Sequence, residues 1–186
     1  MVNNSLLDKY SKCVFGVANM EYLGHFISAA GVFTDPKKIL VVQQWHVPIT
    51  VKQLKGFLGL ARYYRKFIGN YGLISRPLTE FLKKDNFNWS TSADQAFIAL
   101  KTTLAIAPVL ALPNYSAPFL VETDASGTGI GVVLMQEGHP LDFISKGLAP
   151  SHVALSVYEK ELLALAFVVS KWSQYLMGQY FIIKTD

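Results

Sequence analysis

Apolar residues recur at helical spacing through the first part of the chain. Asp35 followed by Pro36 predicts a helix start, because an acidic N-cap and a proline at the first helical position both favour it. Thr50 is expected to cap a longer helix, and Thr91 or Ser92 another. The predicted helices cover residues 36–45, 50–68, 76–82 and 91–104. Four successive helices indicate a small bundle.

Strand-like runs flank this bundle. Residues 14–17 and 22–27 predict a small β-hairpin ahead of it. After Pro113 the pattern changes to three strands, a long helix and a last strand, at residues 119–124, 129–136, 141–145, 156–176 and 180–186. A meander followed by a crossover helix implies that the first and last of these strands are parallel neighbours.

Composition and charge narrow the class of protein. The chain has 186 residues, 51% of them hydrophobic, which suits globular domains. Its longest apolar run, residues 162–169, is far shorter than the roughly 18 residues of a membrane span. No secretory pattern opens the chain. We therefore expect neither a membrane partner nor secretion.

The single cysteine adds to this expectation. Cys13 is expected to be a packed strand residue, and one cysteine can close no internal disulfide and make no zinc site by itself. An intracellular location, in the cytoplasm or the nucleus, is the prediction.

Charge divides the chain unevenly. Residues 1–113 carry 13 Lys and Arg against 6 Asp and Glu, a net +7, whereas residues 114–186 carry 4 against 7, a net −3. A basic part followed by an acidic part suggests that the first binds a polyanion and the second a cation.

Three carboxylates are the candidate cation ligands. Asp124 and Asp186 end two strands that should lie side by side, and Glu161 falls on the apolar face of the helix between them. A carboxylate on an apolar stripe needs a partner or a metal ion, and oxygen ligands suit Mg²⁺ or Mn²⁺. The alternative is structural, since an acid favours the first turn of a helix and Asp often forms turns.

A basic stripe on the predicted 50–68 helix is the candidate polyanion surface. One face of the wheel is apolar, and an adjacent face carries Lys52, Lys55, Arg62 and Lys66. We expect these side chains to bind nucleic-acid phosphates without sequence preference.

Several longer motifs resemble a known family. Residues 22–25, 45–48, 52–60 and 63–68 resemble the reverse transcriptase of gypsy-type long-terminal-repeat retrotransposons. Residues 123–126, 158–164 and 185–186 look like its ribonuclease H domain. The resemblance runs from about Cys13 to Asp186.

The resemblance implies an organisation and an α+β fold. Residues 1–32 correspond to a hairpin at the end of the palm, residues 33–113 to a helical thumb and connection, and residues 114–186 to a truncated ribonuclease-H-like mixed sheet with one long helix. The hairpin corresponds to the primer grip, which implies nucleic-acid contacts by Tyr22, Gly24 and His25.

The resemblance also implies a function. In that family, metal ions bound by four carboxylates hydrolyse the RNA strand of an RNA/DNA hybrid, and Asp124, Glu161 and Asp186 match three of the four. The fourth acid, the last strand and the closing helix have no counterpart, so weak or lost hydrolysis is expected. The paired aspartates of the polymerase are also absent, so DNA polymerisation is not expected.

Two alternatives follow from these departures. The chain is either a ribonuclease H-type hydrolase that binds hybrid or duplex nucleic acid, or a non-enzymatic interaction protein derived from a retroelement. The final strand would also leave an open sheet edge, so either a homodimer through this strand or aggregation is expected.

Overall fold

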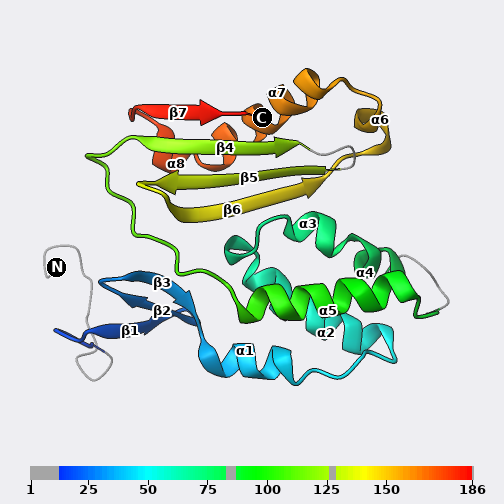
Figure 1. Ribbon diagram of the computed structural model, residues 1–186. Helices are drawn as coiled ribbons and strands as arrows, with labels where there is room; N and C mark the ends of the chain where they lie inside the picture. The colour runs from blue at the N-terminus through cyan, green and yellow to red at the C-terminus, as the bar shows by residue number, and fades with distance from the viewer. Residues whose placement is uncertain (1–12, 83–86, 126–128, 186) are drawn as a thin grey trace, which may run out of the picture.

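The computed structural model describes residues 13–82, 87–125 and 129–185. Figure 1 shows two regions, one built around helices with a small sheet beside them, the other a larger sheet with helices on one face. The α+β class predicted from the sequence is confirmed. Within the described ranges, no helix is both long and apolar enough to cross a membrane.

The N-terminal sheet has three strands where a hairpin of two was expected. Its antiparallel strands are β1 (Asn19–Tyr22), β2 (His25–Ser28) and β3 (Gly31–Thr34). The predicted strand at residues 14–17 does not form, and Cys13 lies half-buried outside any strand. Residues 22–27 are split by a two-residue turn, Leu23 and Gly24, which both have positive φ.

Five α-helices and one 3-10 turn make the helical region. They are α1 (Pro36–Gln43), α2 (Val51–Tyr63), η3 (Arg65–Phe67), α3 (Tyr71–Ile74), α4 (Arg76–Phe81) and α5 (Thr91–Ala105). Asp35 and Thr50 cap α1 and α2 as predicted, each side chain accepting a backbone hydrogen bond. Ser90 caps α5 in place of the expected Thr91 or Ser92.

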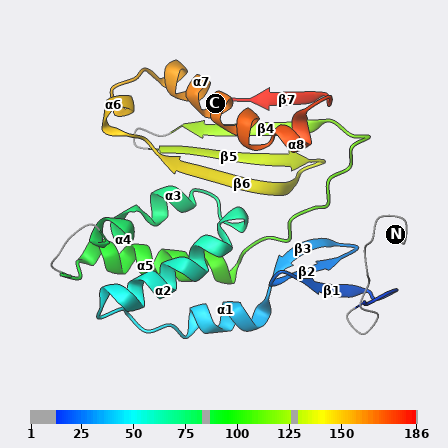
Figure 2. The same cartoon turned by 180° about the vertical axis from the view of Figure 1, so that it is seen from behind.

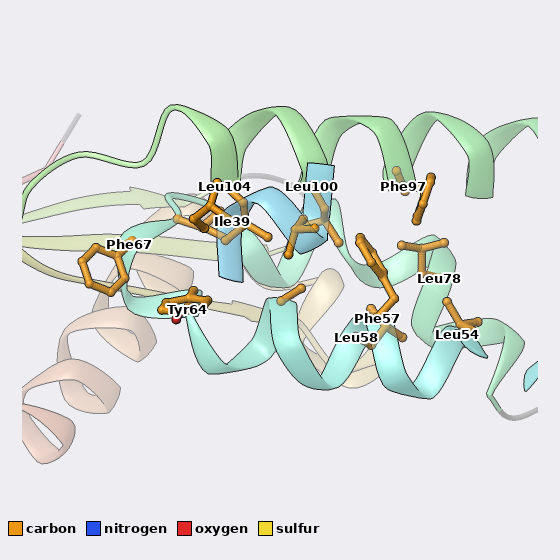
Figure 3. Packing of buried hydrophobic residues seen from close by; sticks show 14 of the residues in the cluster. Ile39, Leu54, Phe57, Leu58, Tyr64, Phe67, Leu78, Phe97, Leu100 and Leu104 are labelled. Atoms are coloured by element: carbon orange, nitrogen blue, oxygen red, sulfur yellow. The ribbon is translucent and has the colours of Figure 1, made fainter. Parts of the chain in front are cut away.

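The core of the helical region is rich in aromatic rings. Figure 3 shows α2 and α5 facing each other across this core, with Phe57, Leu100 and Leu104 between them. The rings of Phe57 and Phe97 lie 4.6 Å apart, centroid to centroid. Burial of these side chains is the main stabilisation of the region.

The second region is a four-stranded sheet in the order β6-β5-β4-β7. Its strands are β4 (Phe119–Ala125), β5 (Gly129–Gln136), β6 (His139–Gly147) and β7 (Phe181–Lys184). β4 pairs antiparallel with β5 and parallel with β7, so the predicted parallel neighbours are confirmed.

The predicted long helix is interrupted. The structure has α6 (Pro150–Val153), α7 (Val157–Lys171) and α8 (Ser173–Leu176). Trp172 ends α7 with non-helical angles, and its indole Nε1 donates to Asp142 Oδ2 at 2.7 Å. Apolar periodicity continues through this break, which is why the sequence predicted a single helix.

The two faces of the larger sheet have different covers. α7 and α8 cover one face, and Phe119, Val121 and Leu134 are buried beneath them. Residues 69–74 of the helical region approach the other face at β5 and β6 (Figure 2). Gly129 permits this approach, because a Cβ there would lie 2.3 Å from Leu73 Cδ2.

Candidate functional site

Asp124 lies near the end of β4 and is exposed. Side chains alternate along the strand, so Phe119, Val121 and the buried Thr123 face α7, whereas Asp124 shares the opposite face with Glu122. Glu122 forms an ion pair with Lys184 of β7. Asp124 is therefore the exposed acid at the carboxyl end of this strand.

Glu161 lies in the second turn of α7, the helix that connects β6 to β7 along one face of the sheet (Figure 1). The fully inward stripe of the helix is Lys160, Ala164 and Val168, and Glu161 is half-buried at its edge. The burial of Lys160 was not foreseen, because a lysine in a charged motif gives no such indication.

Glu159, two residues earlier, has a structural role. Its carboxylate accepts hydrogen bonds from the backbone N–H and the hydroxyl of Ser156, which completes a capping box at the start of α7. These bonds lower the pKa of the Glu159 carboxyl. The Glu159 side chain is exposed.

A shallow hollow of about 230 Å³ surrounds Asp124. Gly69, Asn70 and Phe143 form its other walls, so the helical region contributes to the surroundings of this acid. A Cβ at Gly131, the β5 partner of Asp124, would lie 2.0 Å from Asn70 Oδ1. Asn70 could not be predicted from the sequence, because its contact with the sheet depends on how the two regions pack.

Asp186, the third predicted acid, lies outside the described residues. The described register of β4 and β7 ends with Glu122 opposite Lys184. Across residues 13–82, 87–125 and 129–185, no group of three or more His, Cys, Asp or Glu side chains is arranged to hold a metal ion. Asp124 lies on the face of β4 opposite to the face that α7 covers, and Glu161 belongs to α7.

The donor atoms at this edge of the sheet are oxygens. Besides the two carboxylates, the Thr123 hydroxyl is buried and has no hydrogen-bond partner among the described residues. An oxygen-only set without Cys or His fits Mg²⁺ or Mn²⁺ better than Zn²⁺.

The basic surface of α2 is partly as predicted. Lys52, Lys55 and Arg62 are exposed on the helix. Lys66 is not on the same helical face, because α2 ends at Tyr63 and Lys66 belongs to η3. Its ammonium lies 5.2 Å from the centroid of the Phe67 ring, and burial lowers the pKa of Lys66.

The turn between β1 and β2 is fixed to the end of α2. The hydroxyl of Tyr63 donates to the Leu23 carbonyl oxygen, and that of Tyr64 donates to the Gly24 carbonyl oxygen at 2.9 Å. His25 stacks on Tyr63 with ring centroids 5.0 Å apart. Burial, and then the charge of Lys66, lower the pKa of His25.

This contact positions the three residues predicted at the hairpin. Tyr22 is exposed at the end of β1, and Gly24 occupies the turn. The His25 ring is covered by aromatic side chains, and its Nδ1 has no hydrogen-bond partner among the described residues. Tyr22 and the turn are thus the parts of the hairpin open to a ligand.

Comparison with known proteins identifies the class. Residues 89–183 match the family described as the RNase H-like domain found in reverse transcriptase. The chain belongs to this family, and its relatives include retrotransposon Pol polyproteins.

Two relatives from Drosophila melanogaster illustrate the similarity. The chain is 37% identical over 177 residues to the retrovirus-related Pol polyprotein from transposon 297, and 34% identical over 191 residues to that from transposon gypsy. These alignments cover 94% and 96% of the chain but only 17% and 18% of the relatives.

A solved structure has the same fold. The foamy viral protease-reverse transcriptase in complex with RNA/DNA hybrid superposes with a TM-score of 0.81 at 20% identity, over 90% of this chain and 24% of that one. The α+β fold is therefore that of an RNase H-like region with the preceding helical segment.

Proposed function

We propose that the chain binds RNA/DNA hybrid or duplex nucleic acid and takes part in metal-dependent hydrolysis of the RNA strand. The observation that carries this proposal is the parallel pairing of β4, which bears the exposed Asp124 near its carboxyl end, with β7, through the connecting α7 that bears Glu161. Membership of the RNase H-like family supports it, as does the hybrid bound by a protein of the same fold.

Asp124, Glu161 and Asp186 are the proposed metal ligands and catalytic acids. Divalent ions, when bound, supply an activated water and stabilise the leaving oxygen of the phosphodiester. Asp124 is exposed and accessible to a substrate, whereas the half-buried Glu161 is held by α7. We also propose domain boundaries near residues 32 and 113, which separate the N-terminal hairpin, the helical segment and the ribonuclease-H-like domain.

The basic surface of α2 and the β1–β2 turn are the proposed nucleic-acid contacts. Lys52, Lys55 and Arg62 would bind phosphates, with Tyr22 and Gly24 at the turn beside the end of α2. Lys66 and His25 are half-buried against aromatic rings, so their proposed role is to position this surface.

A hydrolysis assay tests the proposal. Cleavage of a labelled RNA/DNA hybrid is measured in Mg²⁺ and in Mn²⁺ for the wild type, Asp124→Asn and Glu161→Gln. Each variant should lose more than the roughly 10- to 100-fold that removal of an outer-shell partner costs. Glu159→Gln is the matched control, because Gln preserves the capping box. Equal rates in all four proteins would contradict the assigned acids.

The same assay separates the second candidate function, a non-enzymatic interaction protein. The outward side of α7 favours this alternative, because Tyr158, Leu162 and Val169 are exposed there at 84%, 68% and 39%. Hybrid binding without hydrolysis in either metal would support it.

We also propose that the chain forms a homodimer through its β7 strand. β7 is an edge strand within the described sheet, and Ile182 and Ile183 are 48% and 43% exposed. Light scattering at rising concentration should show a dimer that Ile182→Lys disrupts. A stable monomer whose Ile182 and Ile183 amides are protected from exchange would contradict the dimer.

A further inference from the structure

An open cleft separates the helical region from the larger sheet. It consists of two adjoining hollows of about 680 and 580 Å³, formed by α3 and α4 on one side and by β6 and α7 on the other. Figure 1 shows α3 beside β6, where the two regions meet. The hollows are continuous, because both are lined by Gly72, Thr79, Lys146, Gly147 and Phe167.

The smaller hollow is strongly basic. Arg62 and Arg65 enter it from the helical region, and Lys146 and Lys171 enter it from the sheet region. Its lining contains no Asp or Glu. Within the described parts of the chain, none of these four cations forms a salt bridge. The four are called the cleft cations below.

The surroundings do not neutralise this charge. In the larger hollow, Glu80 is already paired with Arg76, with 3.4 Å between Nε and Oε1. Asp142 is half-buried and accepts the hydrogen bond of Trp172, and burial raises the pKa of its carboxyl although the charges of Lys66 and Arg65 oppose that shift. The cleft therefore has an excess of positive charge that an anion can satisfy.

One aromatic ring organises the two lysines. The ammonium groups of Lys146 and Lys171 lie 5.0 and 5.9 Å from the centroid of the Phe167 ring. Cation–π attraction favours these positions and orders both long side chains at the cleft wall. Because the ring already contacts two cations, it is poorly suited to stack on a base, and the chemistry here suits phosphate.

We propose that this cleft binds the phosphate backbone of a nucleic-acid strand, with the cleft cations contacting it from both regions. The inference rests on the proposed nucleic-acid binding and extends it to a second surface. Lys146 and Lys171 lie in the acidic part of the chain, where net charge alone predicts no polyanion contact. A strand bound there would also link the helical region to the sheet that carries Asp124 and Glu161.

Salt dependence of binding tests this inference. Anisotropy of a fluorescein-labelled RNA/DNA hybrid is titrated at several salt concentrations with the wild type and with Lys146→Gln/Lys171→Gln. Loss of two phosphate contacts should reduce the slope of log K against log salt by about 1.8, at about 0.9 for each contact. Lys146→Arg/Lys171→Arg should restore the slope, because it keeps both charges.

A matched pair separates the two surfaces. Lys52→Gln/Lys55→Gln removes two exposed charges from α2, away from the cleft lining. If both surfaces bind phosphate, combining the two pairs should add their slope changes. A different result is that the cleft variant binds the hybrid as tightly as the wild type at every salt concentration while the α2 variant binds it more weakly. That result would contradict phosphate binding in the cleft and leave the proposed function intact.

A small probe distinguishes sources of phosphate. Inorganic tripolyphosphate is titrated by calorimetry against the wild type and the cleft variant. Loss of hybrid affinity in the cleft variant, with or without loss of tripolyphosphate binding, supports binding of a nucleic-acid strand in the cleft. If only tripolyphosphate binding is lost, the cleft is a site for small phosphates, and the proposal that it binds a nucleic-acid strand is contradicted. A wild type that binds no hybrid at any salt concentration overturns both the proposed function and this extension.

Discussion

The two hydrophobic cores differ in how much they depend on each other. The helical core is closed by its own helices and contains Phe57, Phe97 and other rings in contact. The larger sheet buries one face against α7 and α8, but part of its other face lies against residues 69–74 of the helical region. The packing of the sheet region therefore depends on the helical region more than the reverse.

This difference places the site at a junction. Asp124 belongs to the sheet, but Gly69 and Asn70 form part of the hollow around it. The cleft cations come equally from both regions. Changes that loosen the junction should therefore affect the site before either core unfolds.

The largest expected effect comes from the helical core. Phe57 is fully buried against Phe97 and Trp45, so Phe57→Ala should lower the free energy of unfolding by about 3–5 kcal/mol. Urea titration measures this loss. Hydrogen exchange should show reduced protection in α2 and also in β5 and β6. Full protection of the sheet strands would show that the regions are independent.

The junction itself can be disturbed at one glycine. Gly129→Ala would bring a Cβ within 2.3 Å of Leu73 Cδ2 and 2.9 Å of its Cγ, so Leu73 must move, and we expect a loss of about 1–3 kcal/mol. Gly147→Ala is the control, because no heavy atom lies within 4 Å of its added Cβ. Equal melting temperatures for the Gly129→Ala and Gly147→Ala variants would argue against close packing of Leu73 on Gly129.

The contact between α2 and the N-terminal turn gives a smaller effect. Tyr64→Phe removes the hydrogen bond to Gly24 and should cost about 0.5–1.5 kcal/mol near neutral pH. Burial raises the pKa of Tyr64 to about 12. The folded chain then holds this proton more tightly than the unfolded chain, so the Tyr64 contribution is complete below pH 10 and is lost as pH rises toward about 12.

The matching measurement is urea unfolding at several alkaline pH values. Stability should fall more steeply between pH 10 and about 12 in the wild type than in Tyr64→Phe. Parallel curves for the two proteins would contradict a buried, hydrogen-bonded hydroxyl at this position.

The smallest effect is expected at Asp142. Burial raises the pKa of its carboxyl, despite the hydrogen bond from Trp172 and the charge of Lys66. The favourable contribution of the protonated form is present below the ordinary carboxyl pKa and is lost as pH rises through the raised value.

Asp142→Asn removes that dependence but keeps an oxygen for the Trp172 N–H. Its stability at neutral pH should therefore stay within about 1 kcal/mol of the wild type. Unfolding curves compared at acidic and neutral pH provide the check, and a large loss at neutral pH would show that attraction to Lys66 and Arg65 outweighs desolvation.

Local patterns were sufficient to predict much of the fold. Caps such as Asp35 and Thr50, and the meander followed by a helix, indicated the elements and the parallel pairing of β4 with β7. The turn at Leu23 was missed because Leu rarely adopts a positive φ. The break at Trp172 was missed because its indole is fixed by Asp142, which is distant in sequence.

The candidate site was predictable only in part. Residue type and order single out Asp124 and Glu161 as candidates, and their role stays a prediction. The position of Lys66 depended on where α2 ends, and the cleft containing Lys146 depended on how the two regions pack. Local periodicity predicts neither the position of Lys66 nor the cleft, because both follow from contacts between segments that are distant in sequence.

The parallel pairing of β4 with β7 also constrains the order of events during synthesis. Glu122 and Lys184 are 62 positions apart, so β4 leaves the ribosome well before the strand that completes its edge. The helical region can fold while β4 still lacks this neighbour, since N-terminal parts generally fold first. Long-range strand pairing is a slow step. The edge of the sheet formed by β4 and β7 is thus assembled late, after the exposed lysines of α2 are already in place.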